Sequence, residues 1–307
     1  MNENTLHRSK NALDLKASRQ LNRRDRPGDE YMSTNALLED GAERVDEDAN
    51  SSEDHHEVTV DLISKLQESS YTIAHILALA AMLVVIWWIN TLGGLSWKRG
   101  QAKLVFNWHP LLMVASFCFM TVASLSFRFS FLQQRLDRGR LKVVHGSAWL
   151  VAALCAVVAL LAVFRSHNDA KSGFVANMYS FHSWIGAAVI LLYALQFFVG
   201  LFSFAFPPRF VTPEIKATAL LFHVFAGPLI YVLTATTILL GIQEKEGFIG
   251  CAYKVESADL FPFLNIGKIP LPCLVGHILG FLVFSTAITT SFALHNFGSR
   301  YEQRRVN

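Results

Sequence analysis

Six long apolar stretches alternate with short polar segments along most of the chain. They cover residues 71–95, 108–131, 143–164, 178–206, 217–242 and 273–294. Each is long enough to cross about 30 Å of hydrocarbon as a helix of roughly 20 residues, and each is nearly free of charge. Backbone polar groups in lipid must be satisfied within the segment, and the short alternating strands of a barrel would look different. The pattern therefore predicts an all-α membrane protein with six transmembrane helices.

The first 70 residues do not share this pattern. They are polar, basic over residues 8–26 and strongly acidic over residues 29–68. Such a segment cannot bury enough apolar surface to offset its ordering entropy. The sequence therefore predicts three parts, which are a disordered tail over 1–70, a six-helix membrane domain over 71–295 and a short tail over 296–307. The two opposed charge blocks leave a net charge of only +3, and nucleic-acid binding is not expected.

The distribution of charge predicts the orientation in the membrane. No apolar stretch lies near Met1, so we expect no signal peptide and a first helix that acts as a signal anchor. The connection between the second and third helices is basic, as cytosolic loops are, with Arg128, Arg135, Arg138, Arg140 and Lys142. We therefore expect both tails to be cytosolic. A plasma membrane or a secretory or endolysosomal vesicle membrane would suit this topology.

Two of the four cysteines could form a disulfide bond. Cys251 and Cys273 flank the last loop on the side opposite to the tails. A disulfide is plausible there if the compartment is oxidising, and free thiols are the alternative. Cys118 and Cys155 lie inside predicted helices, where small apolar filler is the simpler interpretation.

Four histidines recur at matched depth, one in each of four successive helices. His109, His145, His182 and His223 are separated by 36, 37 and 41 residues, and each lies near the start of its helix. Ionisable groups inside membranes are costly and usually functional. Because successive helices alternate in direction, His109 and His182 fall near the extracytosolic face, and His145 and His223 fall near the cytosolic face. The sequence thus predicts two pairs, each from diagonally opposed helices of a central four-helix bundle.

Two histidines facing each other across a bundle can be the axial ligands of a haem iron. Zinc, copper and a proton relay are alternatives, although zinc prefers about four protein ligands. Gly186 and Gly227 each lie four residues after a paired histidine, on the same helix face. We interpret them as clearance for a porphyrin edge, with close helix packing as the competing explanation.

The motifs around these histidines resemble those of the eukaryotic cytochrome b561 family, in its animal branch. They are Asn107-Trp108-His109-Pro110, Lys142-Val143-Val144-His145-Gly146, Tyr179-Ser180-Phe181-His182-Ser183-Trp184, and His223 with Gly227. The resemblance implies two haem b groups and an ascorbate-dependent transmembrane oxidoreductase. Cytosolic ascorbate would supply single electrons, and monodehydroascorbate or a ferric chelate would accept them on the other side. It also implies a homodimer.

The resemblance also suggests residues for the two substrate sites. On the cytosolic side it implies Lys142, Arg138, Lys216 and Arg128 as the cationic ascorbate site. Ascorbate is a monoanion, so a cationic pocket would concentrate it, although the same charges could be ordinary topology signals. On the other side the resemblance implies His167 and Tyr179, with Phe164 beside them.

Two other classes of function remain open from the sequence. A proton-coupled transporter could use the membrane histidines as relay groups, but it would need an acidic partner inside the bundle. The predicted second to fifth helices hold no Asp or Glu deep within a span. A non-catalytic scaffold that has lost its haem is the other alternative, and the intact set of four histidines argues against it.

Overall fold

A computed structural model describes residues 27–205, 211–251 and 269–295 of the chain. The chain forms two compact units, residues 1–63 and 64–307. All regular structure in the described residues is helical. Within them, six segments are long and apolar enough to cross a membrane, which confirms the predicted fold class.

The first long helix is longer than the sequence pattern predicts. Helix α2 runs without a break over Pro27–Thr91, and its segment Asp61–Thr91 is the first candidate span. Residues 27–70 are thus helical, whereas we expected a segment without regular structure. After Pro27 this stretch contains no further proline and many Glu, Ala and Leu residues, which favour helix even where no apolar face exists. Residues 1–26 and 296–307 of the two predicted tails lie outside the described residues.

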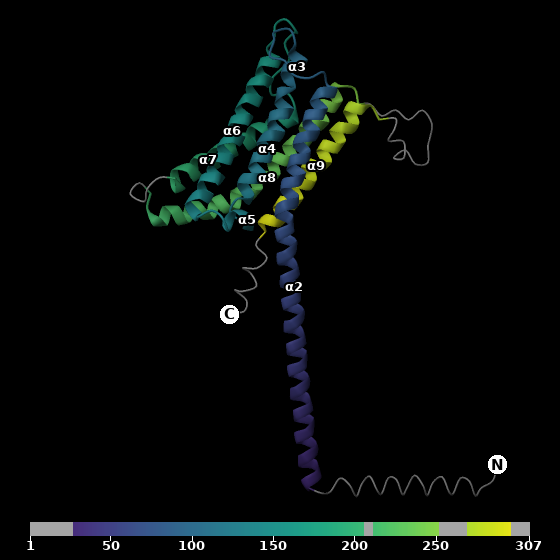
Figure 1. The fold of residues 1–307 in the computed structure, drawn as a ribbon, viewed down its shortest axis with the longest axis vertical. Helices are drawn as coiled ribbons and strands as arrows, with labels where there is room; N and C mark the ends of the chain where they lie inside the picture. The colour runs from purple at the N-terminus through teal and green to yellow at the C-terminus, as the bar shows by residue number, and fades with distance from the viewer. Residues whose placement is uncertain (1–26, 206–210, 252–268, 296–307) are drawn as a thin grey trace, which may run out of the picture. The chain divides into compact units, whose positions relative to one another are not determined.

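The other candidate spans follow the predicted order. The second consists of α3 (Ala102–Phe106) and α4 (Trp108–Leu125), and the short helix α5 (Ser130–Gln133) follows it. The remaining four are α6 (Arg138–His167), α7 (Phe181–Phe204), α8 (Pro213–Phe248) and α9 (Leu271–Leu294). Figure 1 shows these helices running side by side in the second unit.

Side-chain caps set where three of the central helices begin. Asp137 accepts a hydrogen bond from the backbone N–H of Arg140, Ser180 from that of Ser183, and Thr212 from that of Ile215. Such caps satisfy backbone donors that have no partner within the helix. They fix the first turns of α6, α7 and α8 and therefore the depth of the histidines that follow.

Helix α8 extends beyond its predicted apolar stretch at both ends. The segment Gln243-Glu244-Lys245-Glu246 continues the helix because these residues have high helix propensity. Lys245, which the pattern placed in a loop, is therefore part of the last turn of α8. The helix ends near Gly250, whose φ of +78° is one that glycine adopts without strain.

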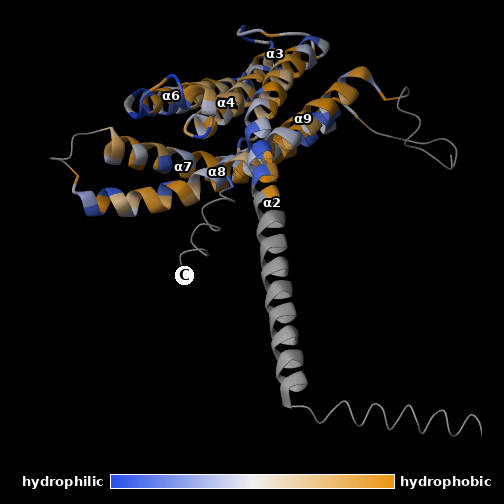
Figure 2. Cartoon of the chain, turned by 60° about the horizontal axis from the view of Figure 1, so that its bottom comes forward, coloured by the Kyte–Doolittle hydropathy of each residue, from blue (hydrophilic) through white to orange (hydrophobic). Residues whose placement is uncertain are grey.

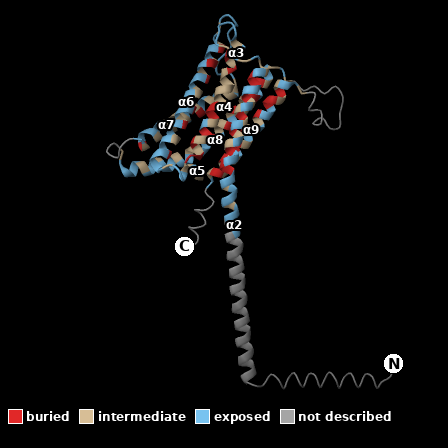
Figure 3. Ribbon diagram, viewed as in Figure 1, coloured by how far each residue is buried: buried red, intermediate tan, exposed pale blue. Residues whose placement is uncertain are grey.

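The buried core lies where α2, α4, α8 and α9 meet. Figure 3 shows buried positions along these helices. Trp88, Phe117, Tyr231 and Leu279 are the largest fully buried side chains of the core. Helix α4 packs on α6 and α8, and α8 packs on α7 and α9. Large apolar side chains such as Leu195, Phe225 and Phe281 remain exposed on the outside, and Figure 2 shows hydrophobic residues along these helices. Extensive exposed apolar surface suits contact with lipid.

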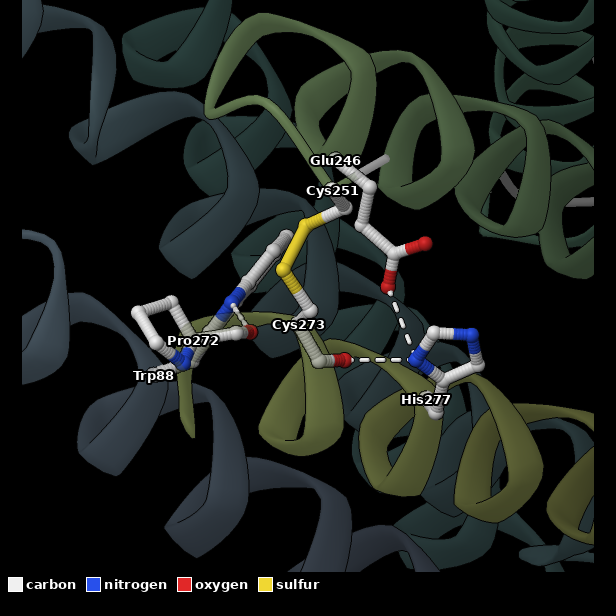
Figure 4. The surroundings of a disulfide bond; sticks show 6 residues. All are labelled: Trp88, Glu246, Cys251, Pro272, Cys273 and His277. Carbon is white, nitrogen blue, oxygen red and sulfur yellow. Dashed lines mark hydrogen bonds and ion pairs between the residues drawn. A yellow bond between two sulfur atoms is a disulfide. The ribbon is translucent and has the colours of Figure 1, made fainter. Parts of the chain in front are cut away.

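A disulfide bond joins the end of α8 to the start of α9. Cys251 and Cys273 are bonded, with a Cα–Cα distance of 5.9 Å (Figure 4). The same region holds the indole of Trp88, which donates to the carbonyl oxygen of Pro272 at 2.7 Å. We call this end of the bundle, where α4, α7 and α9 begin and α6 and α8 end, the disulfide end. The opposite end, where α6 and α8 begin, is called the basic end.

Candidate functional site

The four recurring histidines form two pairs in the structure. At the disulfide end, the rings of His109 on α4 and His182 on α7 have their centroids 6.1 Å apart. At the basic end, the rings of His145 on α6 and His223 on α8 are 6.0 Å apart. Since α4 packs on α6 and α8, and α7 on α8, each pair joins helices that lie diagonally across the bundle. The structure thus brings together the residues that the sequence pattern paired.

Backbone carbonyl groups orient three of the four imidazoles. The Nδ1 atom of His182 lies 2.9 Å from the carbonyl oxygen of Thr237, that of His145 lies 2.8 Å from that of Ala123, and that of His109 lies 3.3 Å from that of Ala159. A ring that donates from Nδ1 keeps the lone pair of its Nε2 for a metal. The Nδ1 of His223 is buried and has no hydrogen-bond partner among the described residues.

Two glycines make room for the paired rings. A Cβ added at Gly241 would lie 2.7 Å from Cε1 of His182, and one added at Gly200 would lie 3.1 Å from Cε1 of His223. Each of these glycines belongs to the helix facing the histidine, so its missing side chain lets the ring lie against the backbone. A side chain at Gly241 would force the His182 ring to move, whereas one at Gly200 would need the His223 ring to shift by a few tenths of an ångström.

The two glycines that the sequence singled out face other neighbours. A Cβ at Gly186 would lie 3.4 Å from a methyl group of Thr237, and one at Gly227 would lie 3.6 Å from the amide of Gln196. Both distances are ordinary van der Waals contacts with the adjacent helix. The role of these glycines in clearing a porphyrin edge stays a prediction.

The paired geometry fits a group whose iron takes one imidazole on each side. Imidazole nitrogens bind first-row metals at about 2.0–2.1 Å, so two rings on opposite sides of one ion would have centroids roughly 6 Å apart. In the described part of the chain, no three His, Cys, Asp or Glu residues gather as a metal-ligand group. A pair alone falls short of a zinc site but suffices for haem, where the porphyrin supplies the other four ligands.

A chain of aromatic contacts leads outward from the pair at the disulfide end. Phe106 lies beside His109, with 5.7 Å between ring centroids, and its ring stacks on His167 at 6.1 Å and an interplanar angle of 12°. The ring of His167 in turn lies 6.5 Å from that of Tyr179. The predicted residues His167 and Tyr179 are therefore together, and Phe106 connects them to the histidine pair. Phe164 is 44% exposed and makes no ring contact with any described residue.

Two charged side chains near the end of α8 lie beside this cluster. The hydroxyl groups of Tyr179 and Ser180 donate to the Glu244 carboxylate at 2.8 and 2.9 Å. The ammonium group of Lys245 lies 3.3 Å from Oδ1 of Asn107 and 4.6 Å from the centroid of the Phe106 ring. Partial burial and the Glu244 carboxylate raise the pKa of Tyr179 to about 12, so this phenol stays a donor at neutral pH.

The loop between α6 and α7 holds His167 and Tyr179 in place. Asp169 accepts hydrogen bonds from the backbone N–H of Gly100 at 2.6 Å and from the hydroxyl of Ser172 at 2.9 Å. These bonds, the first above all, lower the pKa of the Asp169 carboxyl. Just before Tyr179, Met178 has a φ of +58°, and its carbonyl accepts a hydrogen bond from Trp184. A residue other than glycine rarely adopts this backbone conformation, and the residues that do are often found at functional sites.

The four basic residues proposed for ascorbate lie near the ends of their helices. Arg138 and Lys142 are exposed in the first turns of α6, and Lys216 is half-buried in the first turn of α8. Arg128 follows the end of α4, with its backbone N–H donating to Leu125. Because α6 and α8 begin where α4 ends, all four lie at the basic end. Lys142 is one turn before His145 in α6.

Some residues of the site were not singled out from the sequence. They are Phe106, Gly200, Gly241, Glu244 and Lys245. The glycines could not be found from their own helix because the ring that each accommodates comes from another helix. Glu244 and Lys245 would have been found if α8 had been extended through its charged last turn.

Comparison with known proteins gives consistent matches. Residues 108–249 match the family described as eukaryotic cytochrome b561, a segment that contains all four paired histidines. The plasma membrane ascorbate-dependent reductase CYBRD1 of Rattus norvegicus is 35% identical over 172 residues, which are 56% of this chain and 57% of the relative. The chain thus spans little more than half the length of that relative.

Two further relatives are covered more fully. The probable ascorbate-specific transmembrane electron transporter 2 of Oryza sativa subsp. japonica is 34% identical over 58% of this chain and 72% of its own length. The lysosomal membrane ascorbate-dependent ferrireductase CYB561A3 of Mus musculus is 35% identical over 56% of this chain and 68% of its own length. Animal and plant relatives are about equally similar to the chain.

Proposed function

The chain belongs to the eukaryotic cytochrome b561 family, and from this we propose that it moves single electrons from ascorbate across a membrane to an acceptor on the other side. The observation that carries the proposal is the pair of diagonal histidine contacts near the two ends of one bundle, at 6.1 and 6.0 Å. One pair could not serve both faces of a bilayer with a core of about 30 Å. Two pairs divide the crossing into shorter steps.

Two haem b groups would occupy these positions. His109 with His182 and His145 with His223 would be the axial ligands, and each group, when bound, would supply a one-electron redox centre. The backbone carbonyls of Ala159, Thr237 and Ala123 would hold three of the imidazoles in the tautomer that binds iron. Gly200 and Gly241 would keep the rings of His223 and His182 close to the facing helices.

The basic end would bind ascorbate. Lys142, Arg138, Lys216 and Arg128 would attract the monoanion, and Lys142 would place it within a turn of His145. Lysine at position 216 has a single ammonium group, whereas an arginine could donate two parallel hydrogen bonds. We therefore expect Lys216 to bind ascorbate through its charge and single hydrogen bonds.

The disulfide end would deliver the electron. His167 and Tyr179 would contact the acceptor, and Phe106 would link that contact to His109. The single O–H of Tyr179 donates to Glu244, so it would donate to an acceptor such as monodehydroascorbate or a ferric chelate only after it leaves that carboxylate. The name of one relative, an ascorbate-dependent ferrireductase, supports a ferric acceptor.

We place the disulfide end on the extracytosolic side, and both termini in the cytosol. The Cys251–Cys273 disulfide supports this because such bonds persist in oxidising compartments. The basic residues at the other end support it through the positive-inside tendency. Relatives from the plasma membrane and the lysosomal membrane suit either location. The family resemblance also implies that the protein forms a homodimer, which cross-linking in intact membranes would test.

Spectroscopy and reconstitution test the proposal. The purified protein should contain about two haems per chain and show a reduced b-type α-band when ascorbate is added. Vesicles loaded with ascorbate should then reduce external ferricitrate or monodehydroascorbate, and their relative rates would identify the preferred acceptor. Protein without haem would refute the proposal. A proton-coupled transporter would then be the better interpretation, although the partly buried Glu246 carboxylate faces His277 and not the histidine pairs.

A further inference from the structure

Lys245 is a buried cation close to one of the two histidine pairs. Only 9% of the residue is exposed. Its ammonium group lies 3.3 Å from Oδ1 of Asn107 and over the ring of Phe106. The Asn107 amide is itself fixed, because its Nδ2 donates to the carbonyl oxygen of Gly94 at 2.9 Å. Asn107 therefore presents its oxygen, and not its N–H groups, to the lysine.

No carboxylate neutralises this ammonium group within the described part of the chain. The two acidic neighbours in sequence turn elsewhere. Glu244 accepts hydrogen bonds from Tyr179 and Ser180. Glu246 points toward His277, with 3.4 Å between its Oε1 and Nδ1 of that histidine (Figure 4). Gly276 permits this direction, since a Cβ there would lie 2.5 Å from the Glu246 oxygen. The positive charge of Lys245 thus stays uncompensated.

The position of Lys245 relates this charge to the pair at the disulfide end. The Phe106 ring that lies under the ammonium group also contacts His109. At the other pair, apart from the two histidines themselves, the hydrogen-bonding and aromatic side chains that contact the rings in the described residues are uncharged, and they belong to Ser126, Phe127, Trp149 and Phe204. The two pairs therefore differ in the charge buried beside them.

We propose that the positive charge of Lys245 raises the reduction potential of the haem held by His109 and His182 and leaves the potential of the other haem unchanged. This inference rests on the proposed function, because it assumes bound haem. One electron, supplied by ascorbate, reduces the iron from ferric to ferrous, and no bond forms or breaks. The charge at the centre falls by one, and a nearby cation in a low-dielectric interior stabilises the reduced state. The charge would thereby draw electrons toward the disulfide end.

Spectroelectrochemical titration of the haem-loaded protein tests this inference. Lys245→Met should lower one of the two midpoint potentials by about 59 mV, which is a tenfold change in a one-electron equilibrium constant. The second midpoint should not move. Lys245→Arg, which keeps the charge, should retain the original potential. The shift should persist at high salt because a buried charge is weakly screened.

Lys98 provides the matched control. It is an exposed lysine between α2 and α3 at the same end of the bundle, so Lys98→Met removes the same formal charge from solvent-exposed surface. That variant should leave both potentials in place. If Lys245→Met fails to assemble, Asn107→Asp provides the second arm, since it sets a carboxylate beside the intact lysine and should lower the same potential.

The outcomes separate this inference from the proposed function. Absence of haem in the unmodified protein would refute the proposed function itself. Two haems with unmoved potentials in Lys245→Met would refute only the role of Lys245. A raised KM for the acceptor with unmoved potentials would also overturn the inference, because it would make Lys245 a substrate-binding residue.

Discussion

The Nδ1 atom of His182 lies 2.9 Å from the carbonyl oxygen of Thr237, a residue one helical turn before Gly241 in α8. The edge of the ring that carries Nδ1 and Cε1 therefore lies against the backbone of the facing helix, next to the Thr237 carbonyl and the bare Cα of Gly241. This single contact fixes the tautomer, the depth and the direction of one predicted ligand. It also makes a glycine on α8 part of the site of a histidine on α7.

Gly241→Ala should displace the His182 ring. The added Cβ would lie 2.7 Å from Cε1, and this crowding should cost about 1–3 kcal/mol unless the ring moves. We expect the haem content to fall from about two to about one per chain, measured by pyridine haemochrome against protein.

Gly247→Ala is the control for that variant. Gly247 lies in the last turn of the same helix, and a Cβ there would meet no atom within 4 Å. It should keep both haems. Equal haem content in both alanine variants would show that the close approach at Gly241 is unimportant for binding.

His182→Ala should remove one haem and spare the other. The other pair, His145 with His223, is formed by two different helices, so ascorbate should still reduce the remaining haem. Electron delivery to an external acceptor should fall by more than about 100-fold, because the aromatic path from His109 to His167 would have no redox centre behind it. Rapid-mixing absorbance measures the first step, and vesicle reconstitution measures the second.

His277→Ala is the matched control. His277 lies on α9, outside the four-histidine set, and its Nδ1 is 2.6 Å from the carbonyl oxygen of Cys273. We expect two haems and normal delivery. Loss of a haem in this variant, or retention of both in His182→Ala, would contradict the pairing.

The sequence predicted the histidine pairs because two simple facts determine them. Membrane helices must alternate in direction, and an ionisable residue inside one is rare enough to be informative. Together these facts pair His109 with His182 and His145 with His223. They carry no information on which backbone each ring lies against, so Gly200 and Gly241 were not found.

The ends of the helices were harder to predict than their membrane-spanning parts. Hydropathy marks where a segment leaves lipid, whereas the helix continues as long as its residues favour that conformation. This difference explains why Lys245 belongs to α8 and why α2 begins at Pro27. Phe106 was missed for a related reason, since α3 is a separate short helix just before the predicted span.

Lys142→Ala should weaken the binding of ascorbate without removing haem. Lys142 is exposed one turn before His145, and its charge would attract the monoanion. We expect the KM for ascorbate to rise about fivefold at low salt, with a smaller difference at high salt because exposed charges are screened. Lys171→Ala removes an exposed lysine at the opposite end and should leave this KM unchanged. A KM that is insensitive to Lys142 would identify this lysine as a topology signal only.

Reduction of the Cys251–Cys273 disulfide should destabilise the disulfide end. The bond closes a segment with a sequence separation of 22, for which chain entropy predicts about 3 kcal/mol. Cys251→Ser with Cys273→Ser should therefore lower the temperature of haem loss, measured by the Soret band on heating. A reductant should produce the same shift in the unmodified protein and none in the double variant. Cys118→Ser, which changes a free thiol and keeps the disulfide, should still show the shift when reductant is added.

The Asp169 carboxylate gives the disulfide end a defined response to acid. Its pKa is lowered, chiefly by the hydrogen bond from the Gly100 amide, so ionised Asp169 stabilises the folded loop. For a group with a depressed pKa, this contribution is present above the unfolded value of about 3.9 and is lost as pH falls through the folded value. The loop that follows His167 should therefore keep this hydrogen bond at pH 5 and loosen only well below pH 4. Asp169→Asn should imitate the acid state at pH 7, with faster hydrogen exchange of the Gly100 amide and several-fold slower electron delivery. Reduction by ascorbate at the basic end should not change.

Asp137→Asn, which alters a helix cap at the basic end, should leave the Gly100 amide unaffected. Unchanged exchange at Gly100 in Asp169→Asn would show that this hydrogen bond does not hold the loop.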